Sequence, residues 1–136
     1  MTMEWSYSKP PDFEEFWDEA LTELDALPLD LDLRRSELHS TDRAEVFRVS
    51  VSGIGGVTLR GWFAHPIGDG PFATVVILPG YTQALYPPRE WAIDQGMAAL
   101  ALSVRAHEGS ADEIRPGFPG TLIHGITDRR SYIYRG

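Results

Sequence analysis

Two short apolar runs place the strongest constraint on what this chain can fold into. Ala73 to Leu78 is rich in β-branched residues, and Met97 to Val104 is built from small apolar residues. Such runs, bounded by turn residues, are typical of strands buried on both faces of a sheet. The segment between them starts near Pro87, contains Trp91 and ends by Gly96, as a short helix would. Strand, helix and strand form a βαβ unit, which predicts a parallel pair joined by a right-handed crossover.

An amphipathic helix is expected near the N-terminus. Its apolar residues recur at helical spacing, at Phe13, Phe16, Trp17, Ala20, Leu21, Leu24 and Leu27. Two prolines precede this stripe and Pro28 follows it, so both ends are marked. Asp12 stands at the N-cap position, and Glu15 three residues later resembles a capping box. We therefore predict that residues 1–30 form an N-terminal helical extension.

An antiparallel hairpin is predicted between these two regions. Apolar and polar residues alternate in Glu45 to Ser52 and again in Val57 to His65. The glycine-rich segment Gly53 to Gly56 supplies the turn, because glycine tolerates a positive φ. A nucleotide-binding glycine loop is the weaker reading, since these glycines join two strands and do not open a helix. Residues 45–104 are therefore expected to hold the first strands of a mostly parallel sheet in an α/β fold.

Composition excludes several classes of function. The chain has 136 residues and a formal net charge of -8, and such a surface repels phosphate backbones, so we expect no nucleic-acid partner. Cysteine is absent, which removes disulfides, thiol nucleophiles and cysteine metal sites. No signal peptide and no membrane-spanning run is visible, so the expected location is the cytoplasm. The histidines form no metal-ligand pair, and we expect neither a metal nor another cofactor.

The chemistry is expected at two loops. Ligands of open α/β sheets bind beyond the carboxyl ends of the strands, where the segments 79–87 and 105–119 lie. In the first loop, Gly80 would let a ligand approach the backbone closely, although an ordinary strand-ending turn has the same composition. In the second loop, His107 is the histidine best placed to reach a cleft, whereas the other three are more simply structural. Ser103 is interpreted as a core residue, and Gly-x-Ser-x-Gly, the nucleophile turn, does not occur.

Several short segments extend nearly from end to end of the chain: Pro11-Asp12-Phe13 with Phe16-Trp17, Leu59-Arg60-Gly61-Trp62-Phe63, Pro79-Gly80-Tyr81, Trp91 with Gly96, Arg105-Ala106-His107, Gly125-Ile126, and Tyr132-Ile133-Tyr134-Arg135-Gly136. In their order and spacing, these segments resemble the carbohydrate esterases of family 7, the acetyl xylan esterases and cephalosporin C deacetylases. Two of them depart from the family pattern. Pro79 replaces a histidine, and Ala106-His107 replaces Gly-Gln after the arginine.

The resemblance implies an α/β-hydrolase fold, of which residues 1–136 are expected to be the N-terminal portion, with 105–136 an irregular cleft segment. It implies that the backbone N–H of Tyr81 belongs to the oxyanion hole, and that Gly80, Arg105 and His107 contact substrate. The substrate would be an acetyl ester of a sugar or small molecule, attacked by a serine. The family's serine, aspartate and histidine would lie downstream of Gly136, so the chain alone is expected to be inactive. Family members also tend to form hexamers, which implies a homo-oligomer.

Two other functions stay open at this point. The chain is also compatible with a non-catalytic module whose open sheet edge recruits a partner. It is equally compatible with an α/β hydrolase of another branch, similar to dienelactone hydrolases or peptidases. In either case, an uncovered apolar edge of a parallel sheet would favour aggregation or pairing with another chain.

Overall fold

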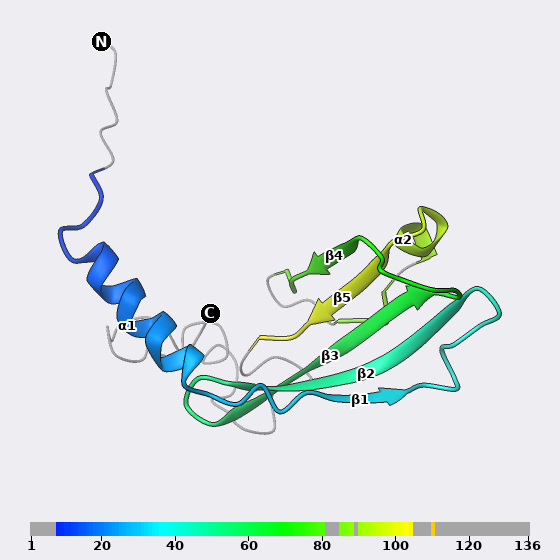
Figure 1. The fold of residues 1–136 in the computed structure, drawn as a ribbon, viewed down its shortest axis with the longest axis horizontal. Helices are drawn as coiled ribbons and strands as arrows, with labels where there is room; N and C mark the ends of the chain where they lie inside the picture. Colours follow the sequence, from blue (N-terminus) through cyan, green and yellow to red (C-terminus); the bar gives the residue numbers. More distant parts are fainter. Residues whose placement is uncertain (1–7, 81–84, 89, 105–109, 111–136) are drawn as a thin grey trace, which may run out of the picture.

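The computed structural model describes residues 8–80, 85–88, 90–104 and 110. Its elements, in chain order, are α1 (Phe13–Asp25), β1 (Asp32–Arg35), β2 (Ala44–Gly53), β3 (Val57–Pro66), β4 (Thr74–Ile77), α2 (Glu90–Asp94) and β5 (Ala98–Leu102). The strands form one five-stranded sheet in the order β1-β2-β3-β5-β4. Figure 1 shows this mixed sheet with α2 at one end and α1 set apart.

The predicted hairpin is the longest part of the sheet. β2 and β3 pair antiparallel from Ala44↔Pro66 down to Gly53↔Val57, as the alternating pattern predicted. At the turn, Gly55 and Gly56 have φ angles of 78° and 73°, a conformation that L side chains rarely adopt. The turn therefore fixes the register, and the register decides which side chains share a face.

The hairpin register divides the sheet into two faces. Phe47, Phe63 and His65 share one side, which we call the aromatic face. Val46 and Ala64 share the opposite side, together with Pro87, Pro88 and Ile93 from the α2 region around one groove. We call this opposite side the α2 face.

The predicted βαβ unit is confirmed. β4 and β5 pair parallel, from Thr74↔Ala98 to Ile77↔Ala101, with α2 between them in the chain. Gly96 has a φ of 69° just after α2, which is the left-handed geometry that ends a helix. Ala98, Ala99 and Ala101 in β5 are each at most 1% exposed, so β5 lies in the core.

The prediction that the first apolar run is buried on both faces is wrong. β4 stands at the edge of the sheet, and among the described residues β5 is its only neighbour. Val76 is 60% exposed, and Leu78, just after the strand, is 67% exposed. An apolar run indicates that a strand can be buried, but the number of its neighbours is decided by the rest of the fold.

β1 was not predicted from the sequence. Its residues, Asp-Leu-Arg-Arg, are all exposed and show no burial alternation. The strand is held by antiparallel pairing with β2, from Asp32↔Ser50 to Arg35↔Phe47. Backbone pairing to a preformed hairpin therefore places a strand that has no apolar signal of its own.

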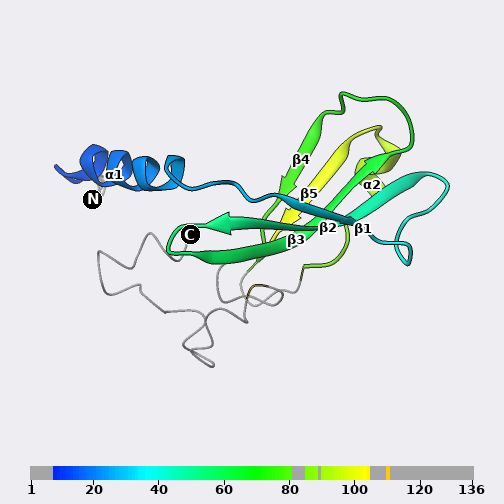
Figure 2. The ribbon, with the colours of Figure 1, turned by 60° about the horizontal axis from the view of Figure 1, so that its bottom comes forward.

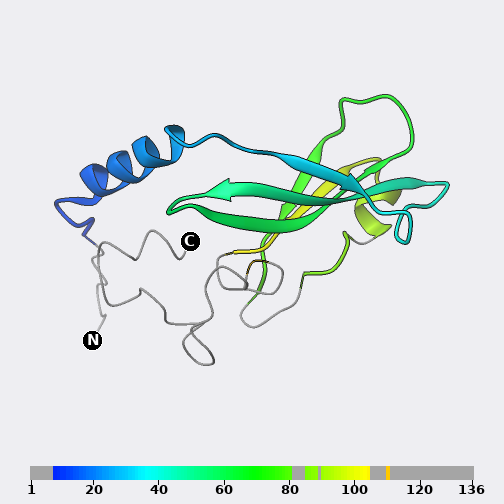
Figure 3. The ribbon, with the colours of Figure 1, turned by 90° about the horizontal axis from the view of Figure 1, so that it is seen from below.

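The predicted N-terminal helix is present as α1, and it follows the proline pair as expected. Asp12 occupies the N-cap position, but its side chain makes no cap hydrogen bond, so the predicted capping box is wrong. α1 lies beyond the turn end of the hairpin and away from the sheet (Figure 1, Figure 2 and Figure 3). Its apolar residues stay partly open to solvent, with Phe13 40% and Trp17 43% exposed. In the described part of the chain, no helix is long and apolar enough to cross a membrane.

Gly61 lets β3 and β5 approach closely. A Cβ added at Gly61 would lie 2.1 Å from the carbonyl oxygen of Ala101 and 3.0 Å from the Cα of Leu102. Both obstacles are backbone atoms, so a change of rotamer cannot relieve the overlap. This antiparallel contact joins the hairpin to the parallel pair.

Candidate active site

The carboxyl ends of β4 and β5 define the candidate site. The two strands are parallel neighbours, with Ile77 paired to Ala101, so the segments that follow them leave the same edge of the sheet. In α/β sheets this edge is where ligands bind. β4 is followed by Leu78, Pro79 and Gly80, and β5 is followed by Ser103 and Val104.

The chain beyond β5 is anchored to β3 at two points. The backbone N–H of Ser103 donates to the carbonyl oxygen of Arg60 at 2.9 Å. The backbone N–H of Arg60 donates in turn to the hydroxyl of Ser110 at 2.8 Å. Ser103 is 3% exposed and Ser110 is 1% exposed, which confirms Ser103 as a core residue. Arg60 of β3 thus binds both flanks of the segment 105–109, through its carbonyl oxygen and its backbone N–H.

Of the four predicted site residues, Gly80 lies within the part of the chain that the structure describes. Gly80 is exposed and is the third residue after β4, in the loop where close approach to the backbone was predicted. Tyr81, Arg105 and His107 lie outside the described residues, so their roles remain predictions. Sequence analysis missed Ser110, because its partner is a backbone group 50 residues earlier in the chain.

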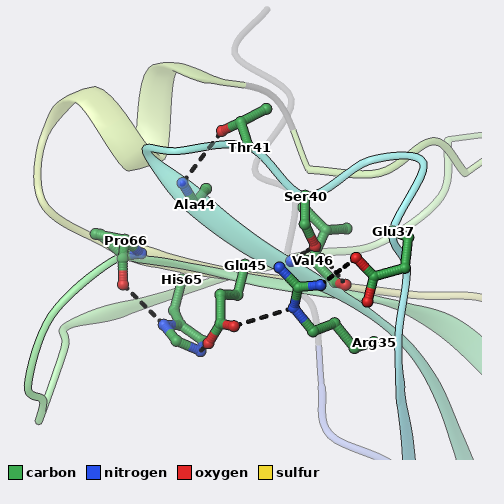
Figure 4. A network of polar contacts seen from close by, with 9 residues as sticks. All are labelled: Arg35, Glu37, Ser40, Thr41, Ala44, Glu45, Val46, His65 and Pro66. Atoms are coloured by element: carbon green, nitrogen blue, oxygen red, sulfur yellow. Dashed lines mark hydrogen bonds and ion pairs between the residues drawn. The ribbon is translucent and has the colours of Figure 1, made fainter.

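A second polar cluster lies on the aromatic face, at the end of β3 and the start of β2 (Figure 4). The Nδ1 atom of His65 contacts the carbonyl oxygen of Pro66 at 2.8 Å, so Nδ1 must carry the proton. The Nε2 atom of His65 lies 3.5 Å from the carboxylate of Glu45, which also accepts from Arg35 at 3.0 Å. The ring is stacked between Phe47 and Phe72, with centroids 5.7 and 5.6 Å away.

Arg35 is the charged centre of this cluster, because it also forms an ion pair with Glu37. The hydrogen bond from Arg35, and then its charge, hold the pKa of the Glu37 carboxyl below its ordinary value. The bonds to Glu37 and then Glu45 raise the pKa of Arg35. The cluster ties β1, β2 and β3 together far from the carboxyl ends of β4 and β5, so we assign it a structural role. That agrees with the prediction for His65.

His39 is likewise engaged in structure. Its Nδ1 atom lies 2.9 Å from the hydroxyl of Ser36, and its ring meets Trp62 edge-on at 4.9 Å. It borders a groove of about 190 Å³ together with Pro87 and Pro88. The groove includes Ala64, which pairs with Ala99 near the start of β5, so it lies at the opposite end from the candidate site. Among the residues that the structure describes, no cluster of three or more histidine, aspartate or glutamate side chains could hold a metal ion.

The sheet order and the parallel β4–α2–β5 unit are those of an α/β-hydrolase fold. The sequence matches the model of the acetyl xylan esterase (AXE1) family over residues 3–136. The chain therefore belongs to the acetyl xylan esterase (AXE1) family, as the sequence resemblance predicted.

Two solved structures share this fold. The acetyl xylan esterase from Paenibacillus sp. R4 matches with a TM-score of 0.78 and 28% identity, over 95% of this chain and 44% of that one. Acetyl xylan esterase 1 from Thermoanaerobacterium sp. JW/SL YS485 matches with a TM-score of 0.73 and 22% identity, over 88% and 39%. At 22% identity the second likeness shows the fold alone. The chain thus spans less than half the length of both proteins.

Proposed function

We propose that this chain forms the N-terminal part of an acetyl esterase that hydrolyses acetyl esters of sugars or small molecules. The family match over residues 3–136 supports ester hydrolysis in general. The observation that carries the proposal is that Pro79-Gly80 follow β4 after one intervening residue, where the carboxyl ends of β4 and β5 are parallel neighbours. In α/β hydrolases a backbone N–H from this loop stabilises the developing oxyanion.

The proposed roles follow from the chemistry of acyl transfer. The backbone N–H of Tyr81 would donate to the acyl oxygen as it becomes negative, and Gly80 would leave room for the acetyl group. Arg105 and His107, between the flanks anchored at Arg60, would contact the rest of the substrate. The proposed mechanism uses a serine activated by a histidine, and the 136 residues contain no Gly-x-Ser-x-Gly turn for that serine. The proposal therefore assigns the nucleophile to a further segment, and it requires no cofactor.

The first test concerns the backbone N–H of Tyr81, in an active protein that contains this chain together with the nucleophile segment. Tyr81→Pro removes this donor, whereas Tyr81→Phe keeps it and removes only the phenol hydroxyl. We expect Tyr81→Pro to lower kcat for 4-nitrophenyl acetate by about 10²–10³, as loss of one oxyanion donor does. Tyr81→Phe should retain most of the activity.

Thr82→Pro is the matched control for this test, since it introduces the same ring one residue later. Equal losses in the two proline variants would indicate a general disturbance of the loop and would contradict the assignment of Tyr81. A series of acetyl, butyryl and octanoyl esters separates an acetyl esterase from other branches of the α/β hydrolases. Preference for the longer acyl groups would overturn the proposed substrate.

The second test concerns the 136-residue chain by itself. We expect the purified chain to release no acetate from 4-nitrophenyl acetate above the buffer rate, because a partial oxyanion hole without a nucleophile cannot form an acyl-enzyme. Turnover by this chain that a serine-reactive inhibitor abolishes would show that the nucleophile has been misplaced.

A further inference from the structure

A polar groove of about 330 Å³ crosses β1, β2 and β3 on the α2 face, and one of its lining residues is Arg60, whose backbone anchors the flanks of the segment 105–109. The polar side chains of its lining are those of Asp32, Arg34, Arg48, Ser50, Thr58 and Arg60. Cross-strand pairing places them on one side of three adjacent strands, which lie side by side in Figure 3. With three arginines and one aspartate, the lining carries two more positive than negative charges, in a chain whose net charge is -8.

The arrangement of the arginines is costly for the sheet. Arg34 lies directly opposite Arg48 in the register of β1 and β2, and like charges at such positions destabilise a sheet. Asp32 offsets part of this cost, because it accepts a hydrogen bond from Arg34 at 2.7 Å. On the aromatic face of the same strands, by contrast, Arg35 has two glutamate partners.

Arg48 is held in place without a carboxylate. Its guanidinium carbon lies 4.4 Å from the centre of the Trp62 ring, which fixes the side chain by a cation–π contact. Within the described part of the chain it has no ion pair, and the guanidinium is exposed at the groove. A guanidinium presents a planar fork of N–H donors that matches a carboxylate bidentately. Because Trp62 restrains the side chain, little further ordering is needed when an anion binds.

We propose that this groove binds a small carboxylate anion that also carries hydroxyl groups, of the sugar-acid class. Arg48 would hold the carboxylate, with Arg34 and Arg60 adding positive charge around it. The hydroxyls of Ser50 and Thr58 and the carboxylate of Asp32 offer the donors and acceptors that ligand hydroxyl groups need. The groove volume lies at the lower end of the range of small-molecule sites, which suits a ligand of monosaccharide size.

The overall charge argues for a small anion over a polyanion. The net charge of -8 disfavours a long polyanion, which would extend beyond the groove, whereas a small anion stays beside the arginines of the lining. The site does not depend on the proposed esterase chemistry, because none of its residues takes part in acyl transfer. It can therefore be tested on the 136-residue chain by direct binding.

The test follows the arginine Nε–H signals in ¹H–¹⁵N NMR spectra of the chain at low salt. Sodium D-glucuronate is the probe, D-glucose is the uncharged control, and sodium sulfate is the oxyanion without carbon-bound hydroxyl groups. We expect glucuronate to shift the Arg48 signal saturably, and neither control to reach the same affinity. Arg48→Gln should weaken glucuronate binding by about tenfold or more, since charge-assisted hydrogen bonds are lost.

Two further variants sharpen the result. Arg48→Lys keeps the charge but loses the fork, so its affinity should fall between those of the wild type and Arg48→Gln. Arg43→Gln removes another exposed arginine, one that pairs with Asp94 outside the groove, and it should bind as the wild type does. Equal affinities for glucuronate and glucose, or equal effects of the Arg48→Gln and Arg43→Gln changes, would overturn the site. Sulfate binding as tight as glucuronate binding would overturn the ligand class.

Discussion

Replacement of Gly61 by alanine is the most direct test of how the hairpin joins the parallel strands. The new Cβ would lie 2.1 Å from the carbonyl oxygen of Ala101, where real Cβ atoms are essentially never closer than 3.0 Å. Relief needs a movement of about 0.9 Å, the difference between these two distances. The obstacles are backbone atoms of β5, so the strands themselves must move apart.

The magnitude follows from two costs and one gain. Overpacking of this kind costs about 1–3 kcal/mol. Each weakened backbone hydrogen bond between β3 and β5 adds about 1 kcal/mol. Alanine in place of glycine returns about 0.5 kcal/mol by restricting the unfolded chain. We therefore expect Gly61→Ala to lower the free energy of unfolding by about 2–4 kcal/mol, a large share of the roughly 5–15 kcal/mol of a typical domain.

The assay is urea unfolding followed by circular dichroism at matched protein concentration. Gly70→Ala is the control, since its added Cβ would meet its nearest neighbours in Phe72 at 3.5 Å, an ordinary contact. That variant should stay within about 0.5 kcal/mol of the wild type, as surface substitutions usually do. If Gly61→Ala unfolds at the same urea concentration as the control, the close approach of β3 and β5 is not part of the native sheet.

Three further outcomes follow from the structure. Ser110→Ala should lower the free energy of unfolding by about 1–3 kcal/mol in the same urea assay, because the part-buried N–H of Arg60 loses its acceptor. Arg35→Gln should raise the pKa of the Glu37 carboxyl toward its ordinary value in a ¹³C NMR titration. Because the pKa of Glu37 is lowered in the folded state, its pair with Arg35 stabilises the protein at pH values above the pKa of Glu37 in the unfolded chain. This stabilisation is lost as the pH falls through the pKa of Glu37 in the folded state. Added salt should weaken the stabilisation, because it screens the two charges. Val76→Lys should reduce self-association, measured by ultracentrifugation, and the binding of an apolar dye, measured by fluorescence. The reason is that a charge on an edge strand blocks pairing with another chain. A wild-type chain that is monomeric and binds no dye would contradict this prediction.

Local signals predicted the hairpin and the βαβ unit because their causes are local. Alternation along Glu45 to Ser52 and the glycines at the turn fix pairing between segments that are adjacent in sequence. β1 had no such signal, because it is exposed and is placed by backbone bonds to β2. The burial of β4 was wrongly predicted for a related reason. The apolar residues of β4 indicate that the strand can be buried. Val76 is nevertheless exposed to solvent, because β4 stands at the edge of the sheet.

The parallel strand pair that places the candidate site was predicted from the sequence, whereas the contact of Ser110 with the backbone of Arg60 was not. The position of Gly80 follows from the sheet topology, since it lies three residues after the end of a parallel strand. Ser110 gave no signal in the sequence. A loop serine that is exposed to solvent cannot be distinguished by sequence from one that is buried against a backbone N–H. Gly61 belongs to the segment that resembles the family. The physical reason for a glycine at this position is the close contact with the backbone of Ala101, and only the fold reveals it.

Arg60 contributes to both the candidate site and the polar groove, but through different atoms. Its backbone supports the candidate site, and its side chain lines the groove. Its carbonyl oxygen accepts from the N–H of Ser103 and its own N–H donates to the hydroxyl of Ser110, so its backbone binds both flanks of the segment that carries Arg105 and His107. Its side chain lines the groove on the α2 face. A side-chain change such as Arg60→Gln leaves both backbone hydrogen bonds possible, whereas Ser110→Ala removes one of them and leaves the groove lining intact. If the two features are independent, the first change should weaken anion binding more than stability, and the second should do the reverse.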